Sequence, residues 1–341
     1  GGALLEHFWW GSVFLINVPI IGVAALLAWW LVPKKAGNAS ITIDLHSCWQ
    51  SMLGIIALAY GIKEFAKSDG HVLLAWGALF VGVVTLAVFV RRQLRLPRPL
   101  IDFRLLSATP IATGILIALV ASMTLIGFEL VLSQWFLLVL GKCPLEAGAF
   151  VLPISLGSFF AGPVAGALIG RIGCPRVIAV GLVMCASGIW GYLGLSEAGA
   201  LAQVAVLALC GVGIGFSLTA SSALVMTHLS EDRAGMAGSV EGVAYEFGGG
   251  FGVTIFGSLM TAVYVAHVRS AGIEAMAGSS LDEAYRNAHQ GIQSPAVLQG
   301  AMQAFEASFT AVSGVVIALL FSLAVVVLVL TRNLPRQQVS G

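Results

Sequence analysis

The sequence predicts an all-α polytopic membrane protein, a bundle of about nine transmembrane helices. Three observations predict this class. First, only 10% of the residues are charged and 58% are hydrophobic, whereas a soluble domain carries roughly 25% charged residues. Second, apolar stretches of about 20 residues, the length that spans a bilayer, recur along the chain. Third, the basic residues collect on one side of the membrane when these stretches are threaded alternately through it.

The apolar stretches define the expected spans, and polar or charged residues separate them. The expected ranges are 12–32, 43–62, 71–90, 109–138, 147–169, 176–195, 201–224, 236–265 and 310–331. The fourth and the eighth are longer than a bilayer requires, so we expect these helices to tilt or to protrude.

The distribution of lysine and arginine supports this threading. With Lys34 and Lys35 in the cytoplasm, twelve basic residues lie inside and five outside, which is the bias typical of membrane proteins. The inside set is Lys34, Lys35, Arg91, Arg92, Arg95, Arg98, Arg104, Arg171, Arg176, Arg233, Arg332 and Arg336; the outside set is Lys63, Lys67, Lys142, Arg269 and Arg286. This topology places the first residue outside and the C-terminus inside.

Two polar segments connect the spans. The longest, at about 266–308, is expected outside the membrane, and within it 281–290 is either a short surface helix or a solvated loop. The basic segment 91–104 is expected to be a cytoplasmic connector whose arginines lie near anionic lipid headgroups.

The sequence lacks the residue patterns that are typical of several other function classes. The net charge of +1 gives no basic footprint for nucleic acid. The five cysteines form no C-x-x-C pair and the six histidines lie far apart, so no metal site is expected. The sequence has no nucleotide-binding G-x-x-x-x-G-K-[ST] motif and no H-E-x-x-H or G-x-S-x-G motif. We therefore expect a protein that is not an enzyme and needs no cofactor.

Acidic residues inside the expected spans are the informative exceptions. Glu129 lies in the fourth span, and Glu241 and Glu246 lie in the eighth. A charge at the centre of a membrane helix costs about 2.5–3.5 kcal/mol, so such a residue normally faces a cavity and has a function. A carboxyl group in a wet cavity can hold a proton and release it when a cation arrives. The alternative for each glutamate is a structural hydrogen bond between helices.

Aromatic residues flank these acids, and an aromatic ring can bind an organic cation through its negative face. Tyr245 lies four residues after Glu241, on the same helix face, and Phe128 and Trp135 lie near Glu129. Glu246 is about 140° further round the helix than Glu241, so both could line one wide cavity. Asp44, at the start of the second span, is expected to stabilise the helix N-terminus.

Glycines repeat every four residues in three places: Gly162, Gly166 and Gly170, then Gly211 and Gly215, and then Gly248 and Gly252. Such faces allow helices to approach closely. Static packing is enough to explain most of them, but smooth faces also suit bundles that rock against each other in alternating access.

Four stretches carry a resemblance to a known family: GSVFLINVP (11–19), GKCPLEAGAFVLP (141–153), GALIGRIGCPRV (166–177) and AGSVEGVAYEFGGGFGVTIFG (237–257). They resemble the fourteen-helix drug:proton antiporters of the major facilitator superfamily, in particular its SmvA/QacA group, which exports quaternary ammonium and other cationic compounds. The E-x-x-A-Y-E-x-G-x-G pattern around Glu241 and Glu246 is the most specific element. The resemblance covers essentially the whole chain.

The resemblance implies an organisation in three parts. Residues 1–40 would be the last helix of the N-terminal bundle and a cytoplasmic linker, 41–104 the central two-helix pair with its basic connector, and 105–341 the C-terminal six-helix bundle with the long extracytoplasmic loop at about 266–308. The chain would then be a fragment that lacks the first five helices. Half of the translocation path would be missing, and the fragment alone is not expected to transport.

The resemblance also implies roles for particular residues. Gly166, Gly170, Arg171, Gly173 and Arg176 would form a copy of the family's cytoplasmic gating loop, although Cys174 and Pro175 depart from the usual residues there. Glu129, Glu241, Glu246, Tyr245, Phe128 and Trp135 would form the substrate and proton-coupling site.

The implied function is proton-coupled multidrug efflux of lipophilic and quaternary ammonium cations across the bacterial cytoplasmic (inner) membrane. Partners would be the lipid bilayer, small organic cations, protons and the missing N-terminal helices; nucleic acid is not expected. The proton gradient would supply the energy. The alternatives are a proton-coupled importer of a neutral metabolite, an inactive truncated membrane protein, and a membrane enzyme or scaffold.

Overall fold

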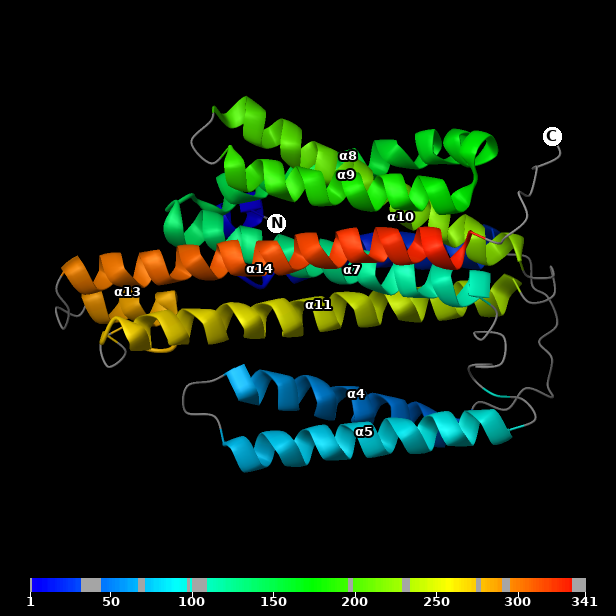
Figure 1. Ribbon diagram of the computed structural model, residues 1–341, viewed down its shortest axis with the longest axis horizontal. Coiled ribbons are helices and arrows are strands. Elements are labelled where there is room, and N and C mark those ends of the chain that lie inside the picture. Colours follow the sequence, from blue (N-terminus) through cyan, green and yellow to red (C-terminus); the bar gives the residue numbers. More distant parts are fainter. Residues whose placement is uncertain are drawn as a thin grey trace.

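The computed structural model describes residues 2–31, 44–66, 71–96, 99, 109–195, 199–228, 234–273, 277–289 and 295–332. These residues form helices and contain no strand. Among them, nine helices are long and apolar enough to cross a membrane. The all-α class and the nine expected spans are therefore confirmed (Figure 1).

The described helices are numbered in chain order. Their bounds are α1 Gly2–His7, α2 Ser12–Leu15, α3 Asn17–Leu31, α4 Leu45–Ala66, α5 Val72–Arg95, α7 Thr109–Gln134, α8 Pro144–Ile172, α9 Cys174–Gly194, α10 Ala200–Thr227, α11 Ala234–Ser270, α13 Leu281–His289 and α14 Pro295–Leu330. At its end α7 continues as a π-helical turn, Trp135–Val139.

The expected loop at about 266–308 is wrong in its extent. Helix α11 continues to Ser270, and α14 begins at Pro295, about four turns before the expected start at 310. The early turns of α14 bury Ala301, Ala304 and Phe305 between polar residues, so an average over the segment hides its apolar face. Between them lies α13, the surface helix that was one of the two expected alternatives.

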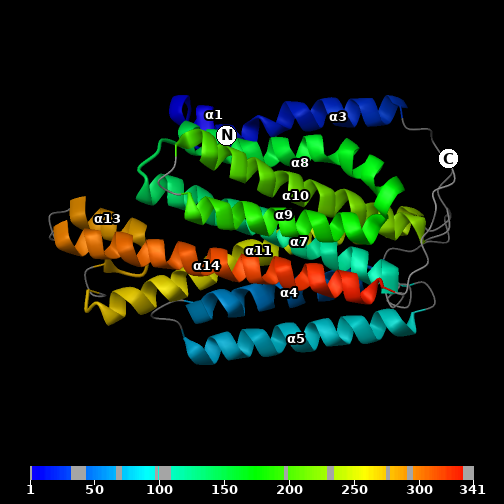
Figure 2. The same ribbon diagram turned by 45° about the horizontal axis from the view of Figure 1, so that its top comes forward.

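Six helices, α7, α8, α9, α10, α11 and α14, form the main bundle (Figures 1 and 2). Its core is made by side chains with almost no solvent exposure, such as Ile154, Ile178, Leu207 and Phe256. These residues fall on the inward stripe of each helix, because residues three and four apart share a face. The outward faces carry large exposed apolar side chains, as expected for a surface in contact with lipid.

Glycines allow the closest helix contacts in this bundle. A Cβ atom at Gly248 would overlap the carbonyl oxygen of Leu119, and one at Gly211 would overlap that of Ile154. Packing therefore explains the glycine faces of α10 and α11. Gly166 and Gly170 differ, since a Cβ at either position would have no heavy atom within 4 Å among the described residues.

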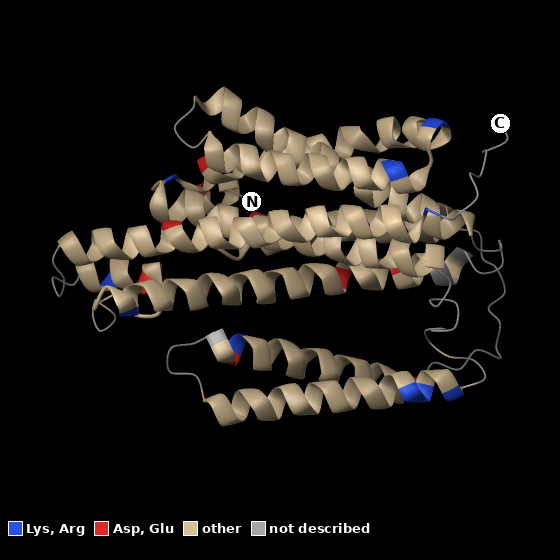
Figure 3. Cartoon of the chain, viewed as in Figure 1, with Lys and Arg blue, Asp and Glu red and all other residues tan. Residues whose placement is uncertain are grey.

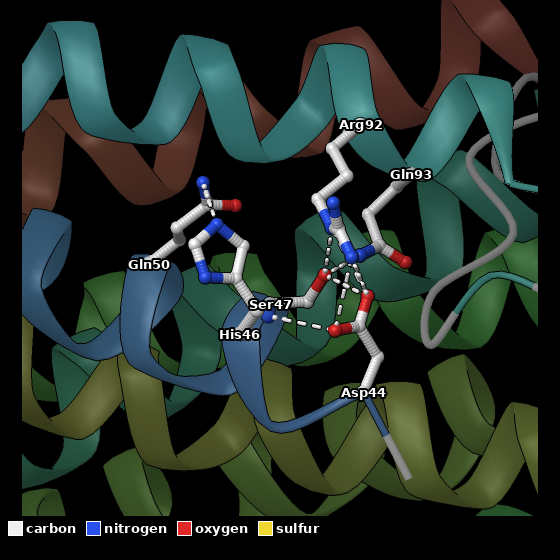
Figure 4. A network of polar contacts seen from close by, with 6 residues as sticks. All are labelled: Asp44, His46, Ser47, Gln50, Arg92 and Gln93. Atoms are coloured by element: carbon white, nitrogen blue, oxygen red, sulfur yellow. Dashed lines mark hydrogen bonds and ion pairs between the residues drawn. The ribbon is translucent and has the colours of Figure 1, made fainter. Parts of the chain in front are cut away.

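Helices α4 and α5 form an antiparallel pair whose first helix packs against α11, and α3 lies on the opposite side of the bundle (Figure 2). Asp44 closes the pair at one end, accepting a hydrogen bond from the backbone N–H of Ser47 at 3.3 Å and pairing with Arg92 at 3.0 Å (Figure 4). The expected role of Asp44 at the helix N-terminus is thus confirmed. Helix α3 has no buried residue, and α1 connects to α8 through Glu6.

Basic residues collect at one end of the molecule, where α5 ends and where α8 turns into α9 (Figure 3). We call this the arginine-rich end; among the described residues it carries Arg91, Arg92, Arg95, Arg171, Arg176 and Arg332. The chain alternates in direction from helix to helix, so these residues lie at the same end of the molecule although they are far apart in sequence.

Candidate functional site

Glu241 is a buried carboxyl group inside the main bundle. Its side chain on α11 is 5% exposed. The hydroxyl of Ser222 on α10 donates a hydrogen bond to its Oε2 at 3.1 Å. Its Oε1 is buried and accepts no hydrogen bond from any residue that the structure describes. One oxygen of this carboxyl is therefore hydrogen-bonded, and the other is buried without a partner among the described residues.

The neighbouring helices fix the position of this carboxyl. The Ser122 hydroxyl on α7 donates to the backbone carbonyl of Tyr245 at 2.7 Å. One turn further along α11, Gly248 lies directly against the α7 backbone. Tyr245 itself lies beside the Glu241 carboxyl, as their spacing predicts. Contacts to α7 and α10 thus hold the α11 segment that carries Glu241 in one register.

Glu246 lies on a different face of α11 from Glu241. Its side chain is exposed, whereas Glu241 is buried, and this agrees with the angle of about 140° between them. The structure does not bring the two carboxyl groups together. A shared cavity for both acids stays a prediction.

Glu129 is half-buried on α7, at a different depth from Glu241. Nearby on α7, Gly127 packs against Gly252 of α11. Gly252 lies eleven residues beyond Glu241, which corresponds to about 16 Å along the helix axis. The two glutamates therefore lie several helical turns apart.

The aromatic residues named from the sequence separate in the structure. Phe128 is part of the packed core, with 2% exposure. Trp135 stacks on Phe309 of α14 with ring centroids 4.8 Å apart, and Tyr192 of α9 meets Phe309 edge-on at 6.2 Å. Trp135 thus belongs to an aromatic cluster between α7, α9 and α14, away from Glu241.

Sequence reasoning did not find the partners of these residues. Ser222 and Ser122 are ordinary serines in apolar helices, and no local motif distinguishes them. Phe309 of α14 and Tyr192 of α9 come close to Trp135 through the packing of three helices, and Trp135 begins the π-helical turn at the end of α7. These contacts depend on which helices are neighbours in space, and the sequence does not show this directly.

The residues expected to form a gating loop lie at the turn between α8 and α9. Helix α8 ends at Ile172 and α9 begins at Cys174, so Gly173 alone connects them. Its φ of 84° is a conformation that L side chains rarely adopt, which explains a glycine here. Arg171 and Arg176 are exposed on either side of this turn. A gating role for this turn stays a prediction.

Two of the scattered cysteines meet inside the bundle. The sulfur atoms of Cys185 on α9 and Cys210 on α10 lie 3.3 Å apart, and both residues are buried. No group of three or more His, Cys, Asp or Glu side chains that could hold a metal ion occurs in the described parts of the chain.

Together these features define a multi-pass helical membrane protein with a buried carboxyl group in its bundle. Residues 1–253 match the family model described as Major Facilitator Superfamily. The chain belongs to the Major Facilitator Superfamily.

Characterised relatives support this assignment. The chain is 37% identical over 314 residues to the methyl viologen resistance protein SmvA of Salmonella typhimurium, an alignment that covers 89% of this chain and 63% of SmvA. It is 35% identical over 272 residues to the multidrug efflux pump LfrA of Mycolicibacterium smegmatis, covering 79% of this chain and 53% of LfrA. It is 28% identical over 263 residues to the multidrug resistance protein Stp of Mycobacterium tuberculosis, covering 77% and 49%. The chain thus spans between about half and two thirds of the length of these relatives.

Proposed function

We propose that the chain is the C-terminal portion of a proton-coupled efflux pump for lipophilic cations, including quaternary ammonium compounds. Its membrane would be the bacterial cytoplasmic membrane, with the arginine-rich end in the cytoplasm. One observation carries the proposal: Glu241 is buried among α7, α10 and α11, and its Oε1 accepts no hydrogen bond from the described residues.

The proposed exchange follows from the chemistry of a carboxyl group in a medium of low dielectric constant. An ionised carboxylate there needs a partner for each oxygen, because an unpaired buried charge is costly. A proton on the carboxyl satisfies that need, and so does a positively charged substrate. The two compete for one group, so the arrival of the cation displaces the proton. Alternating exposure of this group to the two sides would couple their opposite movements.

The names of the relatives support the choice of substrate. Methyl viologen, to which SmvA confers resistance by its name, is an aromatic dication. A carboxylate attracts such a compound, and aromatic rings bind its flat positive faces. In this proposal Tyr245 lies closest to the carboxylate, while Glu246, Glu129, Phe128 and Trp135 are reached at other stages of transport.

Replacement of Glu241 tests this function. In the complete protein, expressed in a host that lacks its own cation pumps, Glu241→Gln should abolish methyl viologen resistance and ethidium efflux, because the amide cannot exchange a proton. The matched control is Glu306→Gln, which removes a carboxyl from the exposed face of α14 and should keep both activities. Immunoblots of membrane fractions check that all variants are present at equal levels.

Two results would contradict the proposal. One is unchanged resistance in Glu241→Gln. The other is ethidium accumulation, rather than extrusion, that depends on the pump and is abolished by a protonophore, since this would indicate an importer. Glu246→Gln, tested in the same assay, asks whether the second acid of the α11 pattern also takes part.

A further inference from the structure

A cavity lies between α4 and α5 at the arginine-rich end, and Glu241 is not among the residues that line it. Its volume is about 580 Å³. The side chains that line it come from one face of each helix: His46 and Gln50 from α4, and Val88, Arg91, Arg92, Arg95 and Leu96 from the end of α5. Three guanidinium groups therefore surround one space.

Among the residues that the structure describes, Arg92 alone of the three arginines pairs with a carboxylate. Arg92 donates to both carboxylate oxygens of Asp44, at 3.1 and 3.2 Å, and also to the Ser47 hydroxyl at 3.2 Å. Figure 4 shows this cluster with His46 and Gln50 beside it, between the two helices. Within the described part of the chain, Arg91 and Arg95 have no carboxylate within ion-pair distance. The described residues thus leave about two positive charges of the cavity without a carboxylate partner, which favours an anion.

Hydrogen bonds around Asp44 hold one side of the cavity in place. Ser47 donates to Asp44 at 2.7 Å and accepts from the buried Gln93 at 2.7 Å, so the network joins the two helices. This holds Arg92 in place with a bidentate geometry, which adds directional specificity. The neighbouring Arg91 and Arg95 project from a helix that is already anchored.

The surroundings of the cavity indicate which anion it takes. The cavity lies where the span Val72–Arg95 ends, which is the depth of lipid headgroups. The apolar residues of α5 that precede it, among them Phe80, Val84 and Val88, are exposed and offer a surface to acyl chains. A free phosphate ion would use only the charged part of this surface. A phospholipid would contact the arginines with its headgroup and the exposed apolar residues of α5 with its acyl chains.

We infer that this cavity binds the headgroup of an anionic phospholipid without an amine, such as phosphatidylglycerol. Arg91 and Arg95 contact the phosphodiester, because guanidinium groups match phosphate oxygens in charge and geometry. An ethanolamine headgroup would bring an ammonium group beside these arginines and is disfavoured. The Oε1 of Gln50 is buried and accepts no hydrogen bond from any described residue. A small rotation of the Gln50 side-chain amide would let this oxygen accept a hydrogen bond from a headgroup hydroxyl.

Native mass spectrometry of the purified chain in detergent tests the inference. Dilute phosphatidylglycerol, phosphatidylethanolamine and phosphatidylcholine with identical acyl chains are added in turn, and the retained lipid is counted. Phosphatidylglycerol should be retained in preference to both others. The double variant Arg91→Gln/Arg95→Gln should weaken its binding by about 25-fold, since each arginine near an anionic lipid contributes about fivefold.

A matched control separates a site from general charge. Arg171→Gln/Arg332→Gln removes two exposed arginines from the same end of the molecule, outside the cavity, and should keep the preference for phosphatidylglycerol. Gln50→Leu keeps every charge and should weaken the binding of phosphatidylglycerol but leave that of phosphatidic acid, whose headgroup has no glycerol hydroxyl, unchanged. This second variant keeps the inference testable if the double variant does not fold.

Three results would overturn the inference. Equal retention of phosphatidylglycerol and phosphatidylcholine would exclude recognition of the headgroup. Equal losses of phosphatidylglycerol binding in the two double variants would indicate attraction by the overall positive charge of this end rather than binding in this cavity. Displacement of the lipid by millimolar inorganic phosphate would identify a site for the free ion.

Discussion

At the scale of single residues, the two acids Glu241 and Asp44 differ in how completely their oxygens are bonded. Asp44 has donors on both oxygens, from Ser47 and Arg92. Glu241 has a donor on Oε2, and its Oε1 has none among the residues that the structure describes. A fully bonded carboxylate stabilises one arrangement, while a partly bonded one can still accept a proton or a cation. The bonding of Asp44 is therefore that of a structural residue, whereas the exchange proposed for Glu241 requires its partly bonded carboxyl.

The structural role of Asp44 predicts a pH dependence. The hydrogen bond from the Ser47 hydroxyl outweighs burial and, with the Ser47 N–H and Arg92, lowers the pKa of Asp44 below its ordinary value of 3.8. Because the pKa is lower in the folded state, the stabilisation is complete above about pH 3.8 and is lost as the pH falls through the folded value. Asp44→Asn should therefore melt at a lower temperature than the unaltered chain at pH 7.

The same comparison at low pH is the check. The difference in melting temperature between Asp44→Asn and the unaltered chain, measured in detergent, should shrink as the pH falls below 3.8. A difference that stays constant down to pH 3 would mean that the charge of Asp44 does not stabilise the α4–α5 pair.

At the scale of helices, close backbone contact between α7 and α11 positions the segment that carries Glu241. Gly127, Gly248 and Gly252 lie where the two helices touch, and an added Cβ at each would meet backbone atoms or a ring of the partner helix. Gly250, on the same helix, has no heavy atom within 4 Å of an added Cβ. An added methyl group would therefore overlap α7 at Gly248 but would meet no neighbour at Gly250.

This difference predicts opposite effects of the same substitution. Gly248→Ala should lower the free energy of unfolding by about 1–3 kcal/mol, because the methyl group forces α7 and α11 apart. Gly250→Ala should leave stability unchanged or raise it by up to about 1 kcal/mol, since alanine favours the helix and meets no neighbour. Thermal unfolding of both variants in one detergent is the measurement. Equal melting temperatures would show that the contact at Gly248 does not limit packing.

The helices also show which structural features the sequence could predict. Span number and approximate position follow from apolar runs, which depend only on local composition. The start of α14 was missed because its first turns bury one narrow stripe, Ala301, Ala304 and Phe305, among polar residues. The stacking of Trp135 on Phe309 joins two helices that are distant in the sequence, so no local pattern could predict it.

At the scale of the whole molecule, the candidate site was only partly predictable. Burial of Glu241 beside Tyr245 could be predicted, because a lone acid in an apolar span must face inward or a cavity. Its bond to Ser222 and the different depth of Glu129 depend on how α7, α10 and α11 are placed, which no local pattern encodes. The exposed Glu246 shows the same limit, since the sequence alone does not indicate which neighbour covers each helix face.

The central claim is that a proton and a cation compete for Glu241, and proton release on substrate binding tests it most directly. Methyl viologen is added to the purified complete protein in a weakly buffered solution with a pH-sensitive dye. We predict acidification with the unaltered protein and with Glu306→Gln, and none with Glu241→Gln. Binding of methyl viologen without proton release, or equal release from Glu241→Gln, would contradict the account.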